Sequence, residues 1–208
     1  MTRFLFVRHG VTTWIEEELL HGVTDIPLSD YGKNQAQLTA ELFKGTHVDK
    51  IYASPLSRTM QTAEPISAVT GVSIIEVPEL MEMHFGFMEG KRDWWPAIRG
   101  KNFLVLIYQA VRLFAGYVSG DPFHVFLRRV GETFDRIADE NPEGTVVIVT
   151  HSAVLRAIFT HIFGGNPIMN KEFGFATASV SEMERLADGM YQLVAVNRNE
   201  HLPKDIDL

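Results

Sequence analysis

Phe4-Leu5-Phe6-Val7-Arg8-His9-Gly10 is a run of four apolar residues that passes directly into a basic and polar tripeptide. Two other short apolar runs, residues 51–53 and 146–149, are likewise followed at once by polar residues. Runs that are apolar throughout are typical of strands covered on both faces, as in a parallel sheet. We therefore expect these three runs to form central strands of a largely parallel sheet.

A helical pattern follows each of these expected strands. The three helices are expected from a Ser29 cap to about Lys44, from Pro55 to Thr70 with Gly71 just beyond, and over residues 153–163 before Gly164-Gly165. Further strands are expected at residues 74–77 and 191–196. The alternation of strand and helix predicts an α/β fold, a three-layer α/β/α sandwich around a mostly parallel central sheet.

The length of 208 residues fits one domain, and we expect residues 1–208 to form a single unit. The stretch at about 93–120 is rich in Trp, Phe, Leu and Tyr and shows no strand pattern, which predicts a helical, cap-like insertion over one end of the sheet. Its most apolar part, residues 103–118, contains Gln109 and Arg112 and is shorter than the ~20 residues that a membrane-spanning helix needs. We therefore expect no membrane partner.

The composition argues against several classes of function. The chain has 19 Lys and Arg against 26 Asp and Glu, a formal net charge of −7, so long-range attraction to nucleic acid is not expected. It has no cysteine, which excludes disulfides, thiolate metal sites and a cysteine nucleophile. The apolar run before Arg8 is too short for the core of a signal peptide, and we expect a cytoplasmic protein.

The polar segments that follow the three expected central strands contain two histidines and two arginines. These segments are Arg8-His9-Gly10, Ser54-Pro55-Leu56-Ser57-Arg58 and Thr150-His151-Ser152. A single His or Arg at a strand end is usually structural. Ligands of open parallel sheets, however, bind outside the carboxyl ends of the strands. If the strands are neighbours, the four side chains converge, and that convergence favours a functional site.

Such a cluster suits the transfer of a phosphoryl group to and from a histidine. Guanidinium groups keep their charge and match the phosphate oxygens, which is the role that we expect for Arg8 and Arg58. The nucleophile must be a neutral imidazole, and two nearby arginines would lower the pKa of His9. His151 could hydrogen-bond the phosphate oxygens and stabilise the transition state.

The alcohol that leaves the phosphorus also needs a proton, which a carboxylic acid can supply. Glu82 follows the expected strand at residues 74–77 and is our choice from its position. Glu79 and Glu89 compete for this role, and spacing alone does not separate the three.

Four ordered blocks of the chain follow a known pattern. They are Phe4 to Gly10 with Thr12, Trp14, His21-Gly22, Asp25, Pro27-Leu28-Ser29, Gly32 and Gln35-Ala36; Ser54, Leu56, Arg58 and Gln61-Thr62-Ala63-Glu64; Leu80, Glu82, Phe85-Gly86 and Glu89-Gly90; and Val147 to His151. In these blocks the chain resembles the histidine phosphatase superfamily, also called phosphoglycerate mutase-like. One Arg-His-Gly tripeptide is a weak signal, whereas four blocks in order make coincidence negligible.

The resemblance implies a role for each candidate residue. His9 would be the phosphorylated nucleophile and Glu82 the proton donor. Arg8, Arg58 and His151 would form the phosphate pocket. No metal or organic cofactor would be required. On the substrate side we expect Thr12, His21, Gly22, Ser152 and Arg156. Arg156 could reach a distal phosphate of the substrate, or it could equally be an ordinary residue of a helix face.

Departures from the family pattern concern the substrate. Ile15 replaces a common Asn, residues 16–18 are all Glu where basic residues are frequent, and Met83 replaces the Arg that mutases usually carry after the acid. A mutase must retain and reorient a bisphosphorylated intermediate, so fewer cations favour a phosphatase that acts on phosphomonoesters. Phosphoglycerate mutase-type transfer and a non-catalytic phosphate-binding module are the alternatives. The expected partner is a small phosphorylated metabolite or a phosphoprotein.

The Gly-Glu-Ser block of the family is degraded in this chain. Gly131-Glu132-Thr133 resembles it but lies too close to Val146, because a whole helix normally intervenes. Counting back from the last expected central strand places Arg129 within that helix. Gly120-Asp121-Pro122 then stands at the position of the block.

Overall fold

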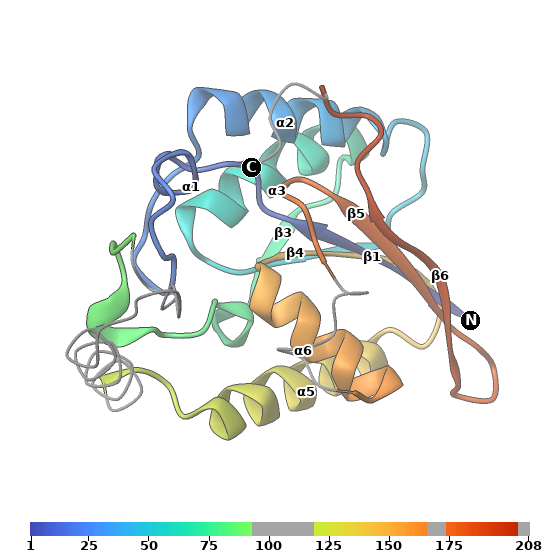
Figure 1. Ribbon diagram of the computed structural model, residues 1–208. Helices are drawn as coiled ribbons and strands as arrows, with labels where there is room; N and C mark the ends of the chain where they lie inside the picture. Colours follow the sequence, from blue (N-terminus) through green and yellow to red (C-terminus); the bar gives the residue numbers. More distant parts are fainter. Residues whose placement is uncertain (93–118, 166–173, 204–208) are drawn as a thin grey trace.

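A computed structural model of the protein describes residues 1–92, 119–165 and 174–203. The expected insertion at about 93–120 lies outside these residues, apart from Ser119 and Gly120. The described residues form a central sheet with helices on both of its faces (Figure 1).

Six strands form this sheet in the order β3-β2-β4-β1-β5-β6. They are β1 (Thr2–Arg8), β2 (Lys50–Ala53), β3 (Ile74–Glu76), β4 (Gly144–Thr150), β5 (Val180–Arg185) and β6 (Tyr191–Arg198). β1 and β2 both pair with β4 in parallel, and β3 pairs with β2 in parallel. β5 and β6 extend the sheet beyond β1 as antiparallel strands. The expected strands at the three apolar runs and the mostly parallel sheet are confirmed.

The helices divide between the two faces of the sheet (Figure 1). They are α1 (Thr13–Glu16), α2 (Asp30–Glu41), α3 (Ser57–Thr70), α5 (Phe123–Glu140) and α6 (Ser152–Phe163), with the short 3-10 helices η1 (Pro78–Leu80) and η2 (Gly86–Met88). α2 and α3 cover one face, and α5 and α6 cover the other. The predicted three-layer α/β/α sandwich is confirmed.

Side chains of each central strand enter two separate cores. On one face, Phe4 and Phe6 of β1 pack against Phe134 of α5, and Phe6 also packs against Phe159 of α6. On the other face, the intervening residues of β1 pack against α2 and α3. Because both faces are covered, these strands are apolar at successive positions rather than at every second one.

Two expected helix boundaries need correction. The helix after Ser29 ends at Glu41 rather than near Lys44, because residues 42–44 continue as turns whose N–H groups bond three residues back. The helix expected from Pro55 begins at Ser57, with Leu56 as its N-cap. The helix expected over residues 153–163 is α6, and it begins one residue earlier, at Ser152.

β5 was not expected from the sequence. This strand reads VSEMER, and its charged residues resemble a surface loop. The structure places Glu182 of β5 in a buried position, where its carboxylate accepts hydrogen bonds from Arg3 Nε at 2.6 Å and Arg198 Nη2 at 2.8 Å. The charge is compatible with a strand because two arginines from distant parts of the chain neutralise it.

Phe134 offers a test of the core beneath α5. Its side chain is fully buried, and its ring centroid lies 5.3 Å from that of Phe4 and 5.9 Å from that of Phe6. We expect Phe134→Ala to lower the free energy of unfolding by about 3–5 kcal/mol in urea denaturation, because it leaves a cavity against β1. Val125→Ala on the exposed side of α5 should change it by no more than about 0.5 kcal/mol. A similar small change for Phe134→Ala would contradict this packing.

Candidate active site

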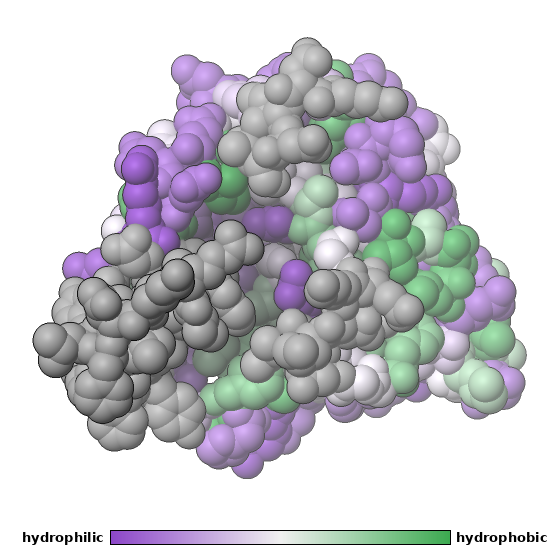
Figure 2. Space-filling view, viewed as in Figure 1, coloured by the Kyte–Doolittle hydropathy of each residue, from purple (hydrophilic) through white to green (hydrophobic). Residues whose placement is uncertain are grey.

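The carboxyl ends of β1, β2 and β4 lie at one level of the sheet. Arg8 is opposite Thr150 in the register, and Ala53 is opposite Val149. The next residue of β1 continues the pairing, because His9 N donates to Thr150 O at 3.0 Å. The space-filling view shows hydrophilic atoms on the floor of a recess in this region (Figure 2). The convergence expected from the sequence is therefore present.

His9 and His151 lie next to each other in this recess. Their ring centroids are 5.2 Å apart and their planes are inclined by 61°. The ring nitrogen Nδ1 of His9 lies 2.8 Å from the carbonyl oxygen of Gly10. A carbonyl can only accept, so Nδ1 carries the proton and the neutral ring keeps a lone pair on Nε2. His9 therefore has the tautomer that a nucleophile at Nε2 requires.

Charge and burial keep both imidazoles neutral. Burial lowers the pKa of His9 well below its usual value, and the nearby guanidinium groups of Arg58 and Arg8 lower it further. Burial also lowers the pKa of His151, again with contributions from Arg58, His9 and Arg8. The positive charges of the two buried arginines disfavour protonation of either imidazole.

The hydrogen bonds of His151 assign its tautomer as well. Arg58 Nε donates to Nδ1 of His151 at 3.3 Å, and Nε2 lies 2.9 Å from Ser54 Oγ. Since Nδ1 accepts, the proton of the neutral ring is on Nε2. His151 therefore donates its Nε2–H to Ser54 Oγ, beside His9.

Arg58 is fully buried at the start of α3. Besides His151, it donates from Nη2 to Gly22 O at 2.6 Å and from Nη1 to Thr24 O at 3.0 Å. Burial lowers the pKa of Arg58, whereas the charges of Glu82, Asp25 and Glu89 raise it. The pKa of an arginine is so high that the group stays charged.

Arg8 is the second cation of the site. Its Nη1 donates to Phe175 O at 2.6 Å, while its buried Nε has no hydrogen-bond partner among the described residues. The pKa of Arg8 is lowered to about 10: burial lowers it most, the charge of Glu82 raises it, and the positive charges of Arg156 and Arg58 lower it. A buried, charged donor without a partner is typical of a group that awaits an anionic ligand.

The surroundings of Glu82 suit a carboxyl group that donates a proton. It is 7% exposed, and its two oxygens accept from Met83 N at 2.9 Å and Ala153 N at 3.2 Å. Burial raises the pKa of Glu82, and this effect exceeds the lowering by these hydrogen bonds and by Arg58 and Arg8. Burial thus favours the protonated form that donates a proton.

The two competing carboxyl groups lie in different surroundings. Glu79 is exposed and lies 3.7 Å from Arg136, away from the histidines. Glu89 accepts several hydrogen bonds. Burial raises its pKa, but the hydrogen bonds from Thr24, Phe85 and Val23 lower it by more. Of these three residues, Glu82 alone combines burial, a raised pKa and electrostatic contact with both arginines.

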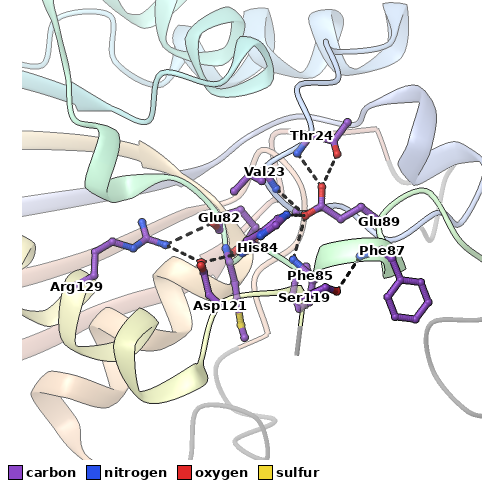
Figure 3. Close-up of polar contacts among 12 residues, drawn as sticks. Val23, Thr24, Glu82, His84, Phe85, Phe87, Glu89, Ser119, Asp121 and Arg129 are labelled. Carbon is purple, nitrogen blue, oxygen red and sulfur yellow. Dashed lines mark hydrogen bonds and ion pairs between the residues drawn. The ribbon is translucent and has the colours of Figure 1, made fainter. Parts of the chain in front are cut away.

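Arg129 and Asp121 hold the segment that carries Glu82 (Figure 3). Arg129 Nη1 donates to Glu79 O at 2.6 Å and to Met81 O at 3.0 Å. Asp121 exchanges two hydrogen bonds with the backbone of His84, at 3.0 Å and 2.8 Å. The expected helix around Arg129 is confirmed, because Arg129 lies in α5, whereas the placement of Asp121 at the degraded block stays a prediction. The sequence assigned neither residue a role.

Thr12 and His21 contact each other, and Gly22 contacts Arg58. Thr12 caps α1 through Ile15 N and contacts His21 Nε2 with its hydroxyl. Burial lowers the pKa of His21 to about 4, helped by Arg58 and Arg8, so this ring is neutral at neutral pH. Gly22 accepts from Arg58, as described above.

Ser152 and Arg156 lie in the first two turns of α6. Arg156 is close enough to Arg8 to lower its pKa. Its buried Nε also has no hydrogen-bond partner in the described part of the chain. Arg156 is therefore a partly buried cation near the site rather than an exposed residue of a helix face.

The structure also bears on metals and membranes. Over residues 1–92, 119–165 and 174–203, no group of three or more His, Asp or Glu side chains is arranged to hold a metal ion. Among the same residues, none of the helices has the length and apolar character to cross a bilayer.

The comparisons with known proteins agree with this geometry. The histidine phosphatase superfamily (branch 1) matches residues 4–199, so the chain belongs to this superfamily. The uncharacterized phosphatase PhoE of Bacillus subtilis is 31% identical over 97% of both chains. A metal-independent phosphoserine phosphatase of Arabidopsis thaliana is 30% identical, covering 78% of this chain and 69% of its own. The chain is accordingly a phosphomonoesterase of this superfamily.

A solved structure shows the same fold. A mutant phosphoserine phosphatase from Entamoeba histolytica in complex with phosphoserine superposes with a TM-score of 0.78. The match covers 98% of this chain and 100% of the other, at 24% sequence identity. The fold is therefore shared over nearly the full length of both proteins.

Proposed function

We propose that this protein is a metal-independent phosphatase that hydrolyses phosphomonoesters through a phosphohistidine on His9. The observation that carries the proposal is the tautomer of His9. Its Nδ1–H is bonded to Gly10 O, so its Nε2 lone pair is free beside two buried guanidinium groups. A neutral nucleophile in a cationic pocket is the arrangement that attack on a phosphate dianion requires.

In the first half-reaction, His9 Nε2 attacks phosphorus. The N–P bond forms as the bond between phosphorus and the alcohol oxygen breaks, and the proton of the Glu82 carboxyl passes to that oxygen. Arg8 and Arg58 bind the phosphate oxygens, and the unpartnered Nε of Arg8 is one of the available donors. His151 lies beside His9 and stabilises the charge that develops on those oxygens when its Nε2–H turns from Ser54 Oγ to a phosphate oxygen.

In the second half-reaction, water attacks the phosphorus of phospho-His9. Glu82, now a carboxylate, accepts a proton from the water as the N–P bond breaks, which regenerates both groups. Inorganic phosphate then leaves the pocket. The two guanidinium groups supply the fixed positive charge that metal ions supply in other phosphoryl-transfer enzymes, so the cycle needs no metal or organic cofactor.

We assign the substrate side to Thr12, His21, Gly22, Ser152 and Arg156. The substrate class is a small phosphorylated metabolite. A phosphoprotein is less favoured, because the proposed phosphate-binding side chains lie in a recess. Arg156 adds a cation near the phosphate pocket, with a free Nε that suits a carboxylate or a distal phosphate. Met83 packs against the core rather than adding a charge, which favours a phosphatase over a mutase.

We further assign the whole of residues 1–208 to one domain with an insertion at about 93–120, acting in the cytoplasm. The family match over residues 4–199 supports the single domain.

Removal of His9 tests the nucleophile. We expect His9→Ala to lower turnover of an aryl phosphate at least about 10³-fold, because no other group replaces the covalent step. Wild-type turnover should persist in EDTA and be blocked by vanadate, and rapid quenching should trap phosphate in an acid-labile linkage. His47→Ala, which changes a largely exposed histidine, is the matched control and should retain full activity. Retained turnover in His9→Ala would reject the phosphohistidine.

The leaving group tests Glu82. The acid donates its proton only below its pKa, so the rate for an alkyl phosphate should fall as the pH rises through the raised pKa of Glu82. We expect Glu82→Gln to abolish this alkaline limb and to slow the alkyl ester by about 10²–10⁴-fold, but the activated aryl ester much less. Glu79→Gln should leave both rates unchanged. Equal losses for the two esters in Glu82→Gln would remove Glu82 from the acid role.

A further inference from the structure

The segment from Gly22 to Thr24 binds the guanidinium group of Arg58. It is neither helix nor strand, and its carbonyl groups at Gly22 and Thr24 receive Nη2 and Nη1 of the guanidinium. These bonds set the direction in which the remaining N–H groups of Arg58 point. The orientation of Arg58 therefore depends on what holds this segment in place.

Glu89 holds it through the backbone (Figure 3). Its Oε2 accepts from Thr24 N at 2.8 Å and from the Thr24 hydroxyl, and its Oε1 accepts from Val23 N at 3.2 Å. The Glu89 side chain is only 6% exposed. The carboxylate thus binds the backbone N–H groups of two consecutive residues.

Gly22 and Glu89 fit together closely. A Cβ atom at Gly22 would lie 2.0 Å from Oε1 of Glu89, so any other residue there would displace the carboxylate. The close contact with Glu89, and not a left-handed backbone conformation, is what favours glycine at position 22.

The same carboxylate reaches the segment that carries Glu82. Oε1 of Glu89 also accepts from Phe85 N at 3.0 Å and lies 3.8 Å from His84 Nε2. One side chain therefore joins the support of Arg58 to the loop that follows Glu82. Its negative charge also raises the pKa of Arg58, as a counter-charge to the buried guanidinium.

We propose that Glu89 is a positioning residue, which fixes Arg58 for phosphate binding and ties the phosphate pocket to the loop of Glu82. This inference rests on the proposed function, because it takes Arg58 as a ligand of the phosphate. Glu89 itself does not contact the phosphate. Its effect passes through the carbonyl groups of Gly22 and Thr24.

Glu89→Gln is the sharpest test, because glutamine has nearly the same shape. Its amide NH₂ must face either the donors of Thr24 or those of Val23 and Phe85, so one group of bonds is lost whichever way it turns. The probe is inorganic phosphate, with its dissociation constant measured by titration calorimetry independently of turnover. We expect Glu89→Gln to weaken phosphate binding about tenfold and to lower kcat/KM for an aryl phosphate about 10- to 100-fold.

Glu182→Gln is the matched control. Glu182 is also a buried carboxylate, 8% exposed at its side chain, but its partners are Arg3 and Arg198 away from the site. We expect this variant to lower the midpoint of thermal unfolding while phosphate affinity stays within about twofold of wild type. Loss of phosphate affinity in both variants alike would reduce Glu89 to a general structural role and overturn the proposal.

A double-mutant cycle with Arg58→Lys separates positioning from stability. Lysine keeps a charge but lacks the rigid planar fork that the two carbonyl groups hold, so in this background Glu89→Gln should weaken phosphate binding by less than about threefold further. Equal losses in the two backgrounds would overturn the proposal. If Glu89→Gln does not fold, Thr24→Val removes one donor to Glu89 and enters the same cycle, with an expected loss of about 2- to 5-fold.

The outcome is independent of the phosphohistidine. If His9→Ala kept its activity while the cycle showed coupling, the chemical mechanism would fail and the role of Glu89 would stand. If phosphate were trapped on His9 while the cycle showed no coupling, the role of Glu89 would fail and the mechanism would stand.

Discussion

The confinement of two guanidinium groups and two imidazoles in one sheltered recess is the constraint on which the site depends. Arg8 and Arg58 stay charged because the pKa of a guanidinium is too high for burial to neutralise it. His9 and His151 must then be neutral, since burial and the two cations both oppose protonation. Backbone and side-chain partners fix which nitrogen carries each proton: Nε2 of His9 is an acceptor, and Nε2–H of His151 is donated to Ser54 Oγ.

The surrounding fold holds these four groups at one level of the sheet. Parallel pairing of β1 and β2 with β4 brings the ends of three strands together, and the two layers of helices exclude water from the strands beneath. Glu82, the proposed acid, is held by other contacts. Arg129, in α5, and Asp121, just before α5, bind the segment that carries Glu82. Glu89 joins the loop after Glu82 to the segment that holds Arg58. The proposed phosphate pocket and the segment of the proposed acid are thus joined through hydrogen bonds of Glu89.

The sequence was sufficient for the groups that lie directly at strand ends. Buried parallel strands are visible as apolar runs, and the residues after them could be placed without knowledge of the rest. It was insufficient where a charge is neutralised by distant partners. β5 was missed because Glu182 pairs with Arg3 and Arg198, which are 179 and 16 residues away. The roles of Arg129 and Glu89 were missed for the same reason, since their partners include Glu79, 50 residues away, and Thr24, 65 residues away. Local sequence also could not choose among Glu79, Glu82 and Glu89, because burial decides that choice.

The central claim is that His9 is neutral and presents Nε2 without a proton. The most direct measurement is a pH titration of the imidazole nitrogens by NMR on ¹⁵N-histidine-labelled protein, with the signal of His9 assigned from His9→Ala. We expect the proton of His9 on Nδ1, and a pKa well below the usual value of about 6.5 that rises in Arg58→Ala. A His9 ring that titrates at or above that value, or that carries its proton on Nε2, would contradict the mechanism at its first step.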